Sequence, residues 1–240
     1  MSRVDVFLIH GISKSVNPDH YYDDFVDGLR KYMPRVNGEV VFHGIDYSHL
    51  LADKEDAIYS WMSGMGYKRI RRFACDFIGD VLAYAWPRRP AQSGDFIYDL
   101  TEMLKARFAE APAGSKKVII GHSLGTIVGY GASWDIPIDA LFTMGSPFCY
   151  FSVRYRNFGE MNPDLKYWVN YYRDNDIVST IIGNNPNFSD HVKDIRVGSW
   201  NPLYHLGGLY SAVKNHTDGY WKSSQVHEDI GKRLYALTLS

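Results

Sequence analysis

A serine between two glycines is the feature of this 240-residue chain that most clearly indicates chemistry. The pentapeptide Gly121-His122-Ser123-Leu124-Gly125 follows three β-branched residues, 118–120, and precedes small and apolar residues, 126–132. This pattern predicts a buried strand, a sharp turn at Ser123 and a helix. Gly121 and Gly125 leave room for the backbone to reverse, so the Ser123 hydroxyl would project from the sheet as a candidate nucleophile. The same residues could also serve only as a tight turn and a helix cap.

Other apolar segments alternate with helical patterns along the chain and would position this serine. The strands that we expect begin near Val4, Val40, Lys117, Ala140, Lys166 and Val192, and the helices cover 19–32, 96–109, the segment after Ser123 and the C-terminal residues. This alternation predicts an α/β class fold, a single domain over 1–240 with one mostly parallel sheet of about six strands flanked by helices. Because ligands bind at the carboxyl ends of such strands, His10, Ser123 and Gly145 should lie near one another.

Residues 46–95 form the least regular part of this pattern. Two helical periodicities occur there, Leu50 to Met62 and Ile70 to Ala85, in a segment rich in aromatic residues and methionine. The segment could be a helical cap over the site or an ordinary helical layer with an insertion, and the sequence leaves both open.

The pentapeptide around Ser123 resembles the nucleophile elbow of α/β-hydrolases of the serine esterase and lipase kind. The resemblance implies a nucleophilic serine, followed along the chain by an acid and then by a histidine. It also implies an oxyanion hole built from two backbone N–H groups, one of them that of Leu124. The other would come from the loop after the first strand, where Ile12 follows Gly11 and the glycine would let the backbone approach a substrate closely.

The loop after the aromatic strand 167–172 offers two candidate acids. Its W-V-N and D-I-V-S runs resemble the acid-bearing loop of lipase-like hydrolases, with Ile177 where a proline is common, and this alignment selects Asp176. Asp174 is the alternative in the same loop. Either aspartate could instead serve only a turn.

The candidate general base is His216, with His205 as the alternative in the same long connection. His216 lies in the loop before the terminal helix, where the resemblance places the base, and the Tyr-Trp pair after it is similar to a stretch in lipase-like proteins. His191 begins the last expected strand and so lies at the wrong end of a parallel sheet. His227 falls within the terminal helix, where we expect it to be exposed to solvent.

Composition limits the possible partners. The 26 basic and 27 acidic residues give a net charge of −1, so there is no electrostatic reason to expect nucleic acid or an anionic membrane as partner. Cys75 and Cys149 form neither a disulfide framework nor a metal-binding motif, and we expect no metal and no cofactor. The apolar run Val4–Ile9 is too short for a signal peptide, no run has the length of a transmembrane segment, and we expect a cytoplasmic protein.

These observations predict a serine hydrolase that cleaves carboxylic esters. A Ser-His-Asp triad of Ser123, His216 and Asp176 would act on a small-molecule or lipid ester through an acyl-enzyme intermediate. Hydrolysis of thioesters or amides, or acyl transfer, would use the same triad. The alternative from another class is a ligand-binding protein that keeps the fold without turnover.

Overall fold

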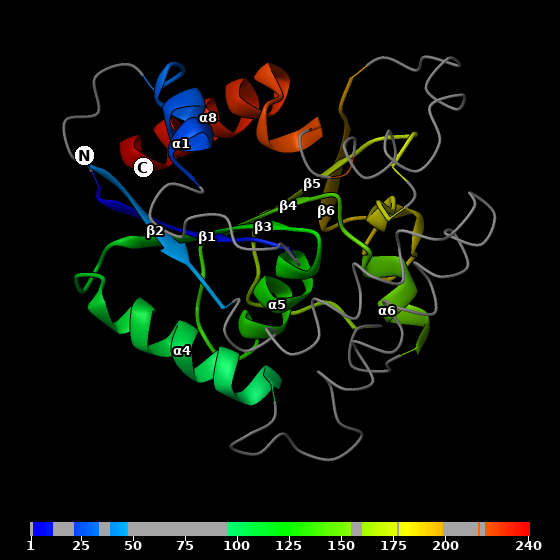
Figure 1. Ribbon diagram of the computed structural model, residues 1–240. Helices are drawn as coiled ribbons and strands as arrows, with labels where there is room; N and C mark the ends of the chain where they lie inside the picture. Colours follow the sequence, from blue (N-terminus) through cyan, green and yellow to red (C-terminus); the bar gives the residue numbers. More distant parts are fainter. Residues whose placement is uncertain are drawn as a thin grey trace.

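A six-stranded parallel sheet forms the centre of the protein (Figure 1). The computed structural model describes residues 2–11, 22–33, 39–47, 96–154, 160–176, 178–198, 216 and 219–240. The strand order is β2-β1-β3-β4-β5-β6, and every neighbouring pair is parallel. The strands are β1 (Val4–Ile9), β2 (Val40–Ile45), β3 (Lys116–His122), β4 (Ala140–Met144), β5 (Trp168–Tyr172) and β6 (Val192–Arg196). The predicted α/β class and its six strands are therefore confirmed.

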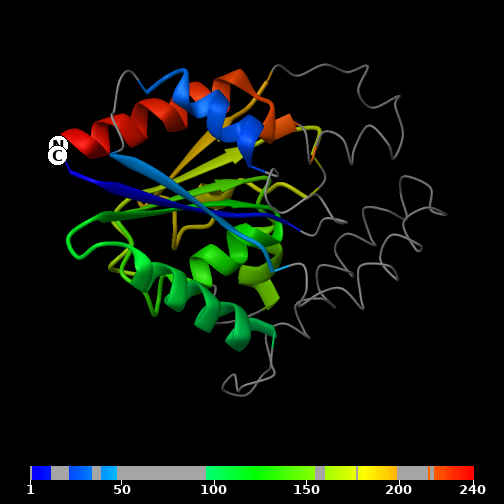
Figure 2. The same cartoon turned by 60° about the vertical axis from the view of Figure 1, so that its left-hand side comes forward.

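Helices cover both faces of the sheet (Figure 2). On one face lie α1 (Asp23–Arg30) and α8 (Ser224–Leu239), which pack against each other. On the other lie α4 (Phe96–Glu110), α5 (Leu124–Ala132) and α6 (Phe148–Arg154). The two ends of the chain are adjacent, because the Ser2 N–H donates to the Thr238 carbonyl at 2.8 Å.

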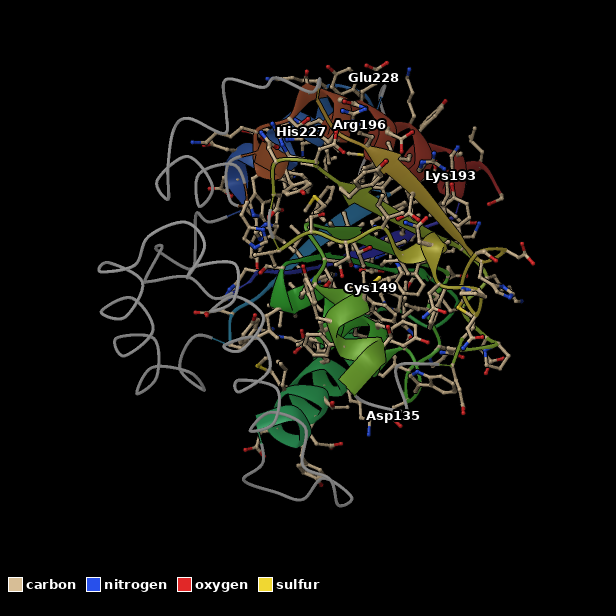
Figure 3. The ribbon with its side chains drawn as sticks, turned by 90° about the vertical axis from the view of Figure 1, so that its right-hand side faces the viewer. Asp135, Cys149, Lys193, Arg196, His227 and Glu228 are labelled. Carbon is tan, nitrogen blue, oxygen red and sulfur yellow. The ribbon has the colours of Figure 1, made fainter. Side chains whose placement is uncertain are left out.

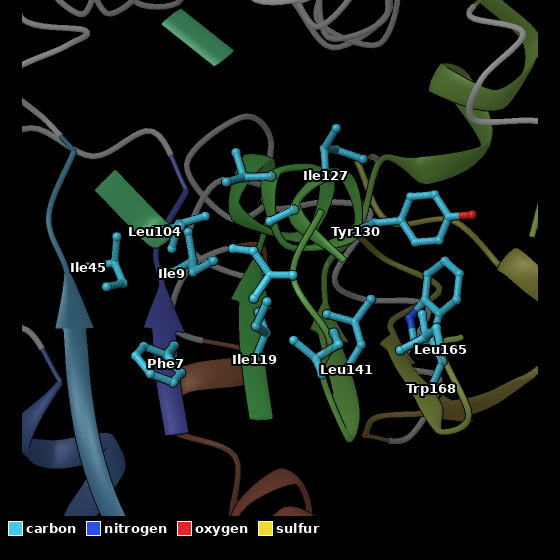
Figure 4. Close-up of a cluster of buried hydrophobic side chains, with 14 of the residues drawn as sticks. Phe7, Ile9, Ile45, Leu104, Ile119, Ile127, Tyr130, Leu141, Leu165 and Trp168 are labelled. Carbon is cyan, nitrogen blue, oxygen red and sulfur yellow. The ribbon is translucent and has the colours of Figure 1, made fainter. Parts of the chain in front are cut away.

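Alternation along the strands divides the core into two layers. In β1, Val4, Val6 and Leu8 face α1 and α8, whereas Phe7 and Ile9 face α4 and α5. Figure 4 shows the second layer, in which Phe7, Ile119 and Leu141 from neighbouring strands lie on the same side of the sheet as Ile127 and Tyr130 of α5. Both faces of the sheet are apolar because helices cover both.

The strand register brings the carboxyl ends of four strands to the same edge. Ile9 pairs with Gly121, His122 pairs with Met144, and Met144 pairs with Tyr171. The residues directly after these strands therefore lie next to one another. They are His10, Ser123, Gly145 and Arg173, the first residue of the acid loop. This edge is where ligands bind in open α/β sheets.

Some elements differ from the sequence-based expectation. Helix α6 follows Gly145-Ser146-Pro147 directly, in a part of the chain for which we predicted no helix, and its Phe148 and Phe151 are buried in the core. Helix α1 ends at Arg30, two residues before the predicted end. Of the 46–95 segment, only Asp46 and Tyr47 lie among the described residues, so the expected cap lies outside them. In the described part of the chain, no helix has the length and apolarity that crossing a membrane requires.

Candidate active site

Ser123 occupies a strained turn between β3 and α5. It is the one described non-glycine residue with a positive φ, at 53°, with ψ at −123°. Such a conformation costs on the order of 1–3 kcal/mol and persists only where neighbouring structure enforces it. The Ser123 N–H donates to the Met144 carbonyl at 2.9 Å, which fixes the turn to β4. This turn places Ser123 at the carboxyl end of β3.

The two glycines of the turn are required by close packing. A Cβ at Gly121 would lie 2.6 Å from the Gly125 carbonyl oxygen, and one at Gly125 would lie 2.3 Å from the Ile9 carbonyl oxygen. Real Cβ atoms do not approach backbone this closely, so α5 could not sit against β1 and β3 with larger residues here. The spacing of the pentapeptide thus has a physical cause in the contact between helix and sheet.

His216 lies between Ser123 and Asp176. Its Nε2 is 2.8 Å from Ser123 Oγ, and its Nδ1 is 2.8 Å from Asp176 Oδ2. Since a carboxylate only accepts hydrogen bonds, Nδ1 carries the proton and Nε2 is left to accept from the serine hydroxyl. The side chain of His216 is 15% exposed, whereas that of Asp176 is fully buried. The serine, imidazole and carboxylate form a continuous hydrogen-bonded chain from the protein interior to the edge of the sheet.

Asp176 is held as a buried carboxylate. Burial alone would raise the pKa of Asp176. His216, the Val178 N–H at 2.9 Å and the Tyr220 hydroxyl at 2.9 Å lower this pKa, and their combined effect is larger than that of burial. The pKa of Asp176 therefore stays below its ordinary value. An ionised carboxylate in this position can stabilise a positively charged imidazole.

His122, the residue before the serine, supports the backbone of His216. Its Nε2 is 2.7 Å from the His216 carbonyl oxygen, and burial, together with the nearby His216, lowers the pKa of His122 to about 3. A neutral imidazole has a single N–H, which must lie on Nε2 because a carbonyl cannot donate. Nδ1 is then a buried acceptor without a partner among the described residues. The sequence motif contained His122, but no sequence signal indicated this contact.

A network of hydroxyl groups adjoins the Ser123 backbone; Thr126 and Ser146 are buried and Thr180 is half-buried. The Thr126 hydroxyl donates to the Ser123 carbonyl at 2.6 Å and lies 2.7 Å from Ser146 Oγ. The Ser146 carbonyl accepts from the N–H of Thr180 at 2.8 Å and from its hydroxyl at 2.9 Å. Thr180 follows Asp176 in the same loop, so the network connects the turn at Ser123 to the loop that carries the acid.

The backbone N–H groups expected to form an oxyanion hole are only partly described. Leu124 is the first residue of α5, and the first N–H groups of a helix have no partner within it. Gly11 lies against the serine, since a Cβ there would be 2.6 Å from Ser123 Cβ. Ile12, the expected second donor, lies outside the described residues.

The other candidate residues take different positions. Asp174, the alternative acid, forms an ion pair with Arg196 at the surface. His191 precedes β6, at the opposite edge of the sheet from Ser123, as predicted. His205, the alternative base, lies outside the described residues.

The expectation that His227 is exposed to solvent is wrong. His227 is buried between α8 and α1, and its Nε2 lies 2.7 Å from the Trp221 carbonyl oxygen (Figure 3). The physical reason is Gly28 on α1, which has no side chain and so leaves space for the imidazole: a Cβ there would lie 2.3 Å from His227 Nδ1. Among the described residues, no group of three or more His, Cys, Asp or Glu side chains is arranged to bind a metal ion.

Comparison with known proteins identifies this fold. No protein-family model matches the sequence, and no curated protein is significantly similar to it.

Among solved structures, Est1E from Butyrivibrio proteoclasticus aligns with 99% of this chain and 89% of its own, at 8% identity and a TM-score of 0.51. ClbQ from the colibactin NRPS/PKS pathway aligns over 99% of both chains, at 12% identity and a TM-score of 0.50. A lidless α/β serine hydrolase from Xanthomonas campestris covers 92% of this chain and 83% of its own, at 13% identity and a TM-score of 0.41. The likenesses to Est1E and ClbQ, together with the parallel sheet and its flanking helices, show that the chain has the α/β-hydrolase fold.

Proposed function

We propose that this protein is a serine hydrolase that cleaves carboxylic esters. The observation that carries the proposal is the position of the His216 imidazole, which is 2.8 Å from both Ser123 Oγ and Asp176 Oδ2. A serine hydroxyl is a weak nucleophile at neutral pH, and a base within hydrogen-bond distance removes this limitation. The strained turn at Ser123 is a second support, because it presents the hydroxyl where a substrate can reach it.

In the proposed reaction, Ser123 Oγ attacks the ester carbonyl while His216 Nε2 takes the hydroxyl proton. The resulting oxyanion accepts hydrogen bonds from backbone N–H groups, for which we assign those of Leu124 and Ile12. His216 then gives its proton to the leaving alcohol, and an acyl group remains on Ser123. A water molecule, deprotonated by His216, attacks the acyl group and releases the acid and the free serine.

Asp176 has two tasks in this scheme. Its carboxylate accepts from Nδ1–H, so it fixes the tautomer in which Nε2 is free to take the serine proton. Its negative charge, retained because its pKa is held below the ordinary value, offsets the positive charge that His216 gains during attack. We favour esters over amides because an alcohol leaves a tetrahedral intermediate more readily than an amine does.

Hydrolysis of a series of p-nitrophenyl esters with increasing acyl chain length tests the proposal. The wild-type protein should release p-nitrophenol, and Ser123→Ala should reduce kcat by several orders of magnitude without loss of fold. Ser152→Ala is a matched control, because the Ser152 hydroxyl donates to the Cys149 carbonyl in α6 and has no contact with the triad. Activity of Ser123→Ala equal to wild type would refute the mechanism, and absence of turnover by the wild type on every ester would favour a ligand-binding protein.

A second pair of variants tests the base. His216→Ala should lower kcat by several orders of magnitude, whereas His205→Ala should mainly change KM or stability. If His205→Ala abolished turnover while His216→Ala retained it, the base would be reassigned and the hydrolase proposal would remain.

A further inference from the structure

Two donors converge on one oxygen of the buried acid. Asp176 Oδ2 lies 2.8 Å from His216 Nδ1 and 2.9 Å from the Tyr220 hydroxyl, and Oδ1 accepts from the Val178 N–H at 2.9 Å. The Tyr220 ring is fully buried. The orientation of the carboxylate is therefore determined by three donors, of which the imidazole would take part in the chemistry and the other two would not.

Tyr220 can only act as a donor in this contact. Burial, and then the negative charge of Asp176, raise the pKa of Tyr220 well above its ordinary value, so the phenol keeps its proton. A carboxylate that accepts a hydrogen bond from a neutral hydroxyl is stabilised in its ionised form. The titratable groups that face Asp176 among the described residues are His122, His216 and Tyr220.

The surrounding backbone is shaped to hold this arrangement. Gly145, with φ at 60°, packs against Tyr220, His216 and Asp176. A Cβ at this position would be 2.9 Å from Tyr220 Cε2, 3.1 Å from His216 Cε1 and 3.2 Å from Asp176 Oδ2. Arg173 Nη1 donates to the Gly219 carbonyl at 2.7 Å, which connects the acid loop to the residue directly before Tyr220. The position of Tyr220 is thus held by the packing around its buried ring and by the hydrogen bond from Arg173 to the backbone of Gly219.

We propose that Tyr220 is a positioning residue, which orients the Asp176 carboxylate so that Oδ2 faces the His216 imidazole. This proposal rests on the function proposed above. The Tyr220 hydroxyl donates to Asp176, and we assign its effect on the imidazole to this contact. Without its hydroxyl, the carboxylate could rotate about its Cβ–Cγ bond and the imidazole would lose its fixed partner.

Tyr220→Phe tests the proposal, because it removes one oxygen and keeps the ring. We expect kcat to fall about tenfold to a hundredfold with KM nearly unchanged, since hydrogen bonds to charged groups are about twice as strong as neutral ones. The midpoint of the Asp176 titration, followed by the NMR signal of its ¹³C-labelled carboxyl carbon, should rise because the ionised form has lost a donor. A role in packing alone would change neither quantity.

Tyr171→Phe is the matched control. Tyr171 is also fully buried, and its hydroxyl donates to Asp229 Oδ2 at 2.7 Å, away from the triad in the layer between the sheet and α8. This variant should leave kcat and the Asp176 midpoint at their wild-type values. A Tyr220→Phe protein with the wild-type kcat or the wild-type midpoint would overturn the proposal. A wild-type protein without esterase activity would refute the proposed function. The Asp176 titration can be measured without turnover, so its midpoint in Tyr220→Phe would still decide the role of Tyr220.

Discussion

The backbone of Gly11 lies directly against the side chain of Ser123. A Cβ at residue 11 would be 2.6 Å from Ser123 Cβ and 3.2 Å from Oγ. Gly11→Ala should therefore displace either the loop after β1 or the serine, and we expect kcat/KM for a short ester to fall about a hundredfold or more, as when an oxyanion-hole donor is lost. Thermal unfolding should show that the fold survives. An alanine variant with wild-type kcat/KM would mean that the loop does not contribute to the site.

The two aspartates of the acid loop should respond differently to the same substitution. Asp176→Asn keeps the shape of the side chain but permits the wrong imidazole tautomer, so kcat should fall about 10³-fold to 10⁴-fold. Asp174→Asn removes a surface ion pair with Arg196, and such pairs contribute little, so kcat should stay within a few-fold of wild type. Steady-state kinetics on one ester decides between them. A severe loss in Asp174→Asn with little change in Asp176→Asn would reverse the assignment.

The buried His122 makes stability depend on pH. Its pKa is about 3 in the folded protein and about 6.5 in an unfolded chain, so its stabilising contribution is present above about pH 6.5 and is lost as pH falls toward about 3. Between pH 7 and pH 5 the free energy of unfolding should fall by about 2 kcal/mol through this residue. His122→Gln can still donate to the His216 carbonyl but does not titrate. Urea unfolding at both pH values should show a smaller fall in the variant, and an equal fall in both proteins would contradict this account.

Local pattern was sufficient to predict the frame of the molecule. The six strands and the turn at Ser123 follow from short apolar and aromatic runs and from glycine spacing, which are properties of neighbouring residues. The burial of His227 could not be predicted, because it depends on Gly28, which is distant in sequence and meets it only when α1 packs on α8. The hydrogen bond between Tyr220 and Asp176 could not be predicted either. The two residues are distant in sequence, and a local hydrophobic pattern does not give the position of a side-chain hydroxyl in the folded protein.

Packing between α1 and α8 can be tested with a double-mutant cycle. Gly28→Ala should destabilise the protein by about 1–3 kcal/mol, because the new methyl group overlaps the His227 ring. In a His227→Ala background the overlap is absent, and the same substitution should stabilise the protein by up to about 1 kcal/mol through helix propensity. Chemical denaturation of the four proteins measures the cycle. Equal effects of Gly28→Ala in both backgrounds would show that the two side chains do not interact.

Covalent labelling of Ser123 is the most direct test of an activated serine. A fluorophosphonate probe should react with the wild-type protein, and peptide mass spectrometry should locate the adduct on Ser123, the residue whose Oγ lies 2.8 Å from His216 Nε2. The account predicts that labelling is lost in Ser123→Ala and strongly slowed in His216→Ala, and that it is unchanged in Ser152→Ala. Labelling of another residue, or undiminished labelling of Ser123→Ala, would contradict the central claim that Ser123 is the nucleophile.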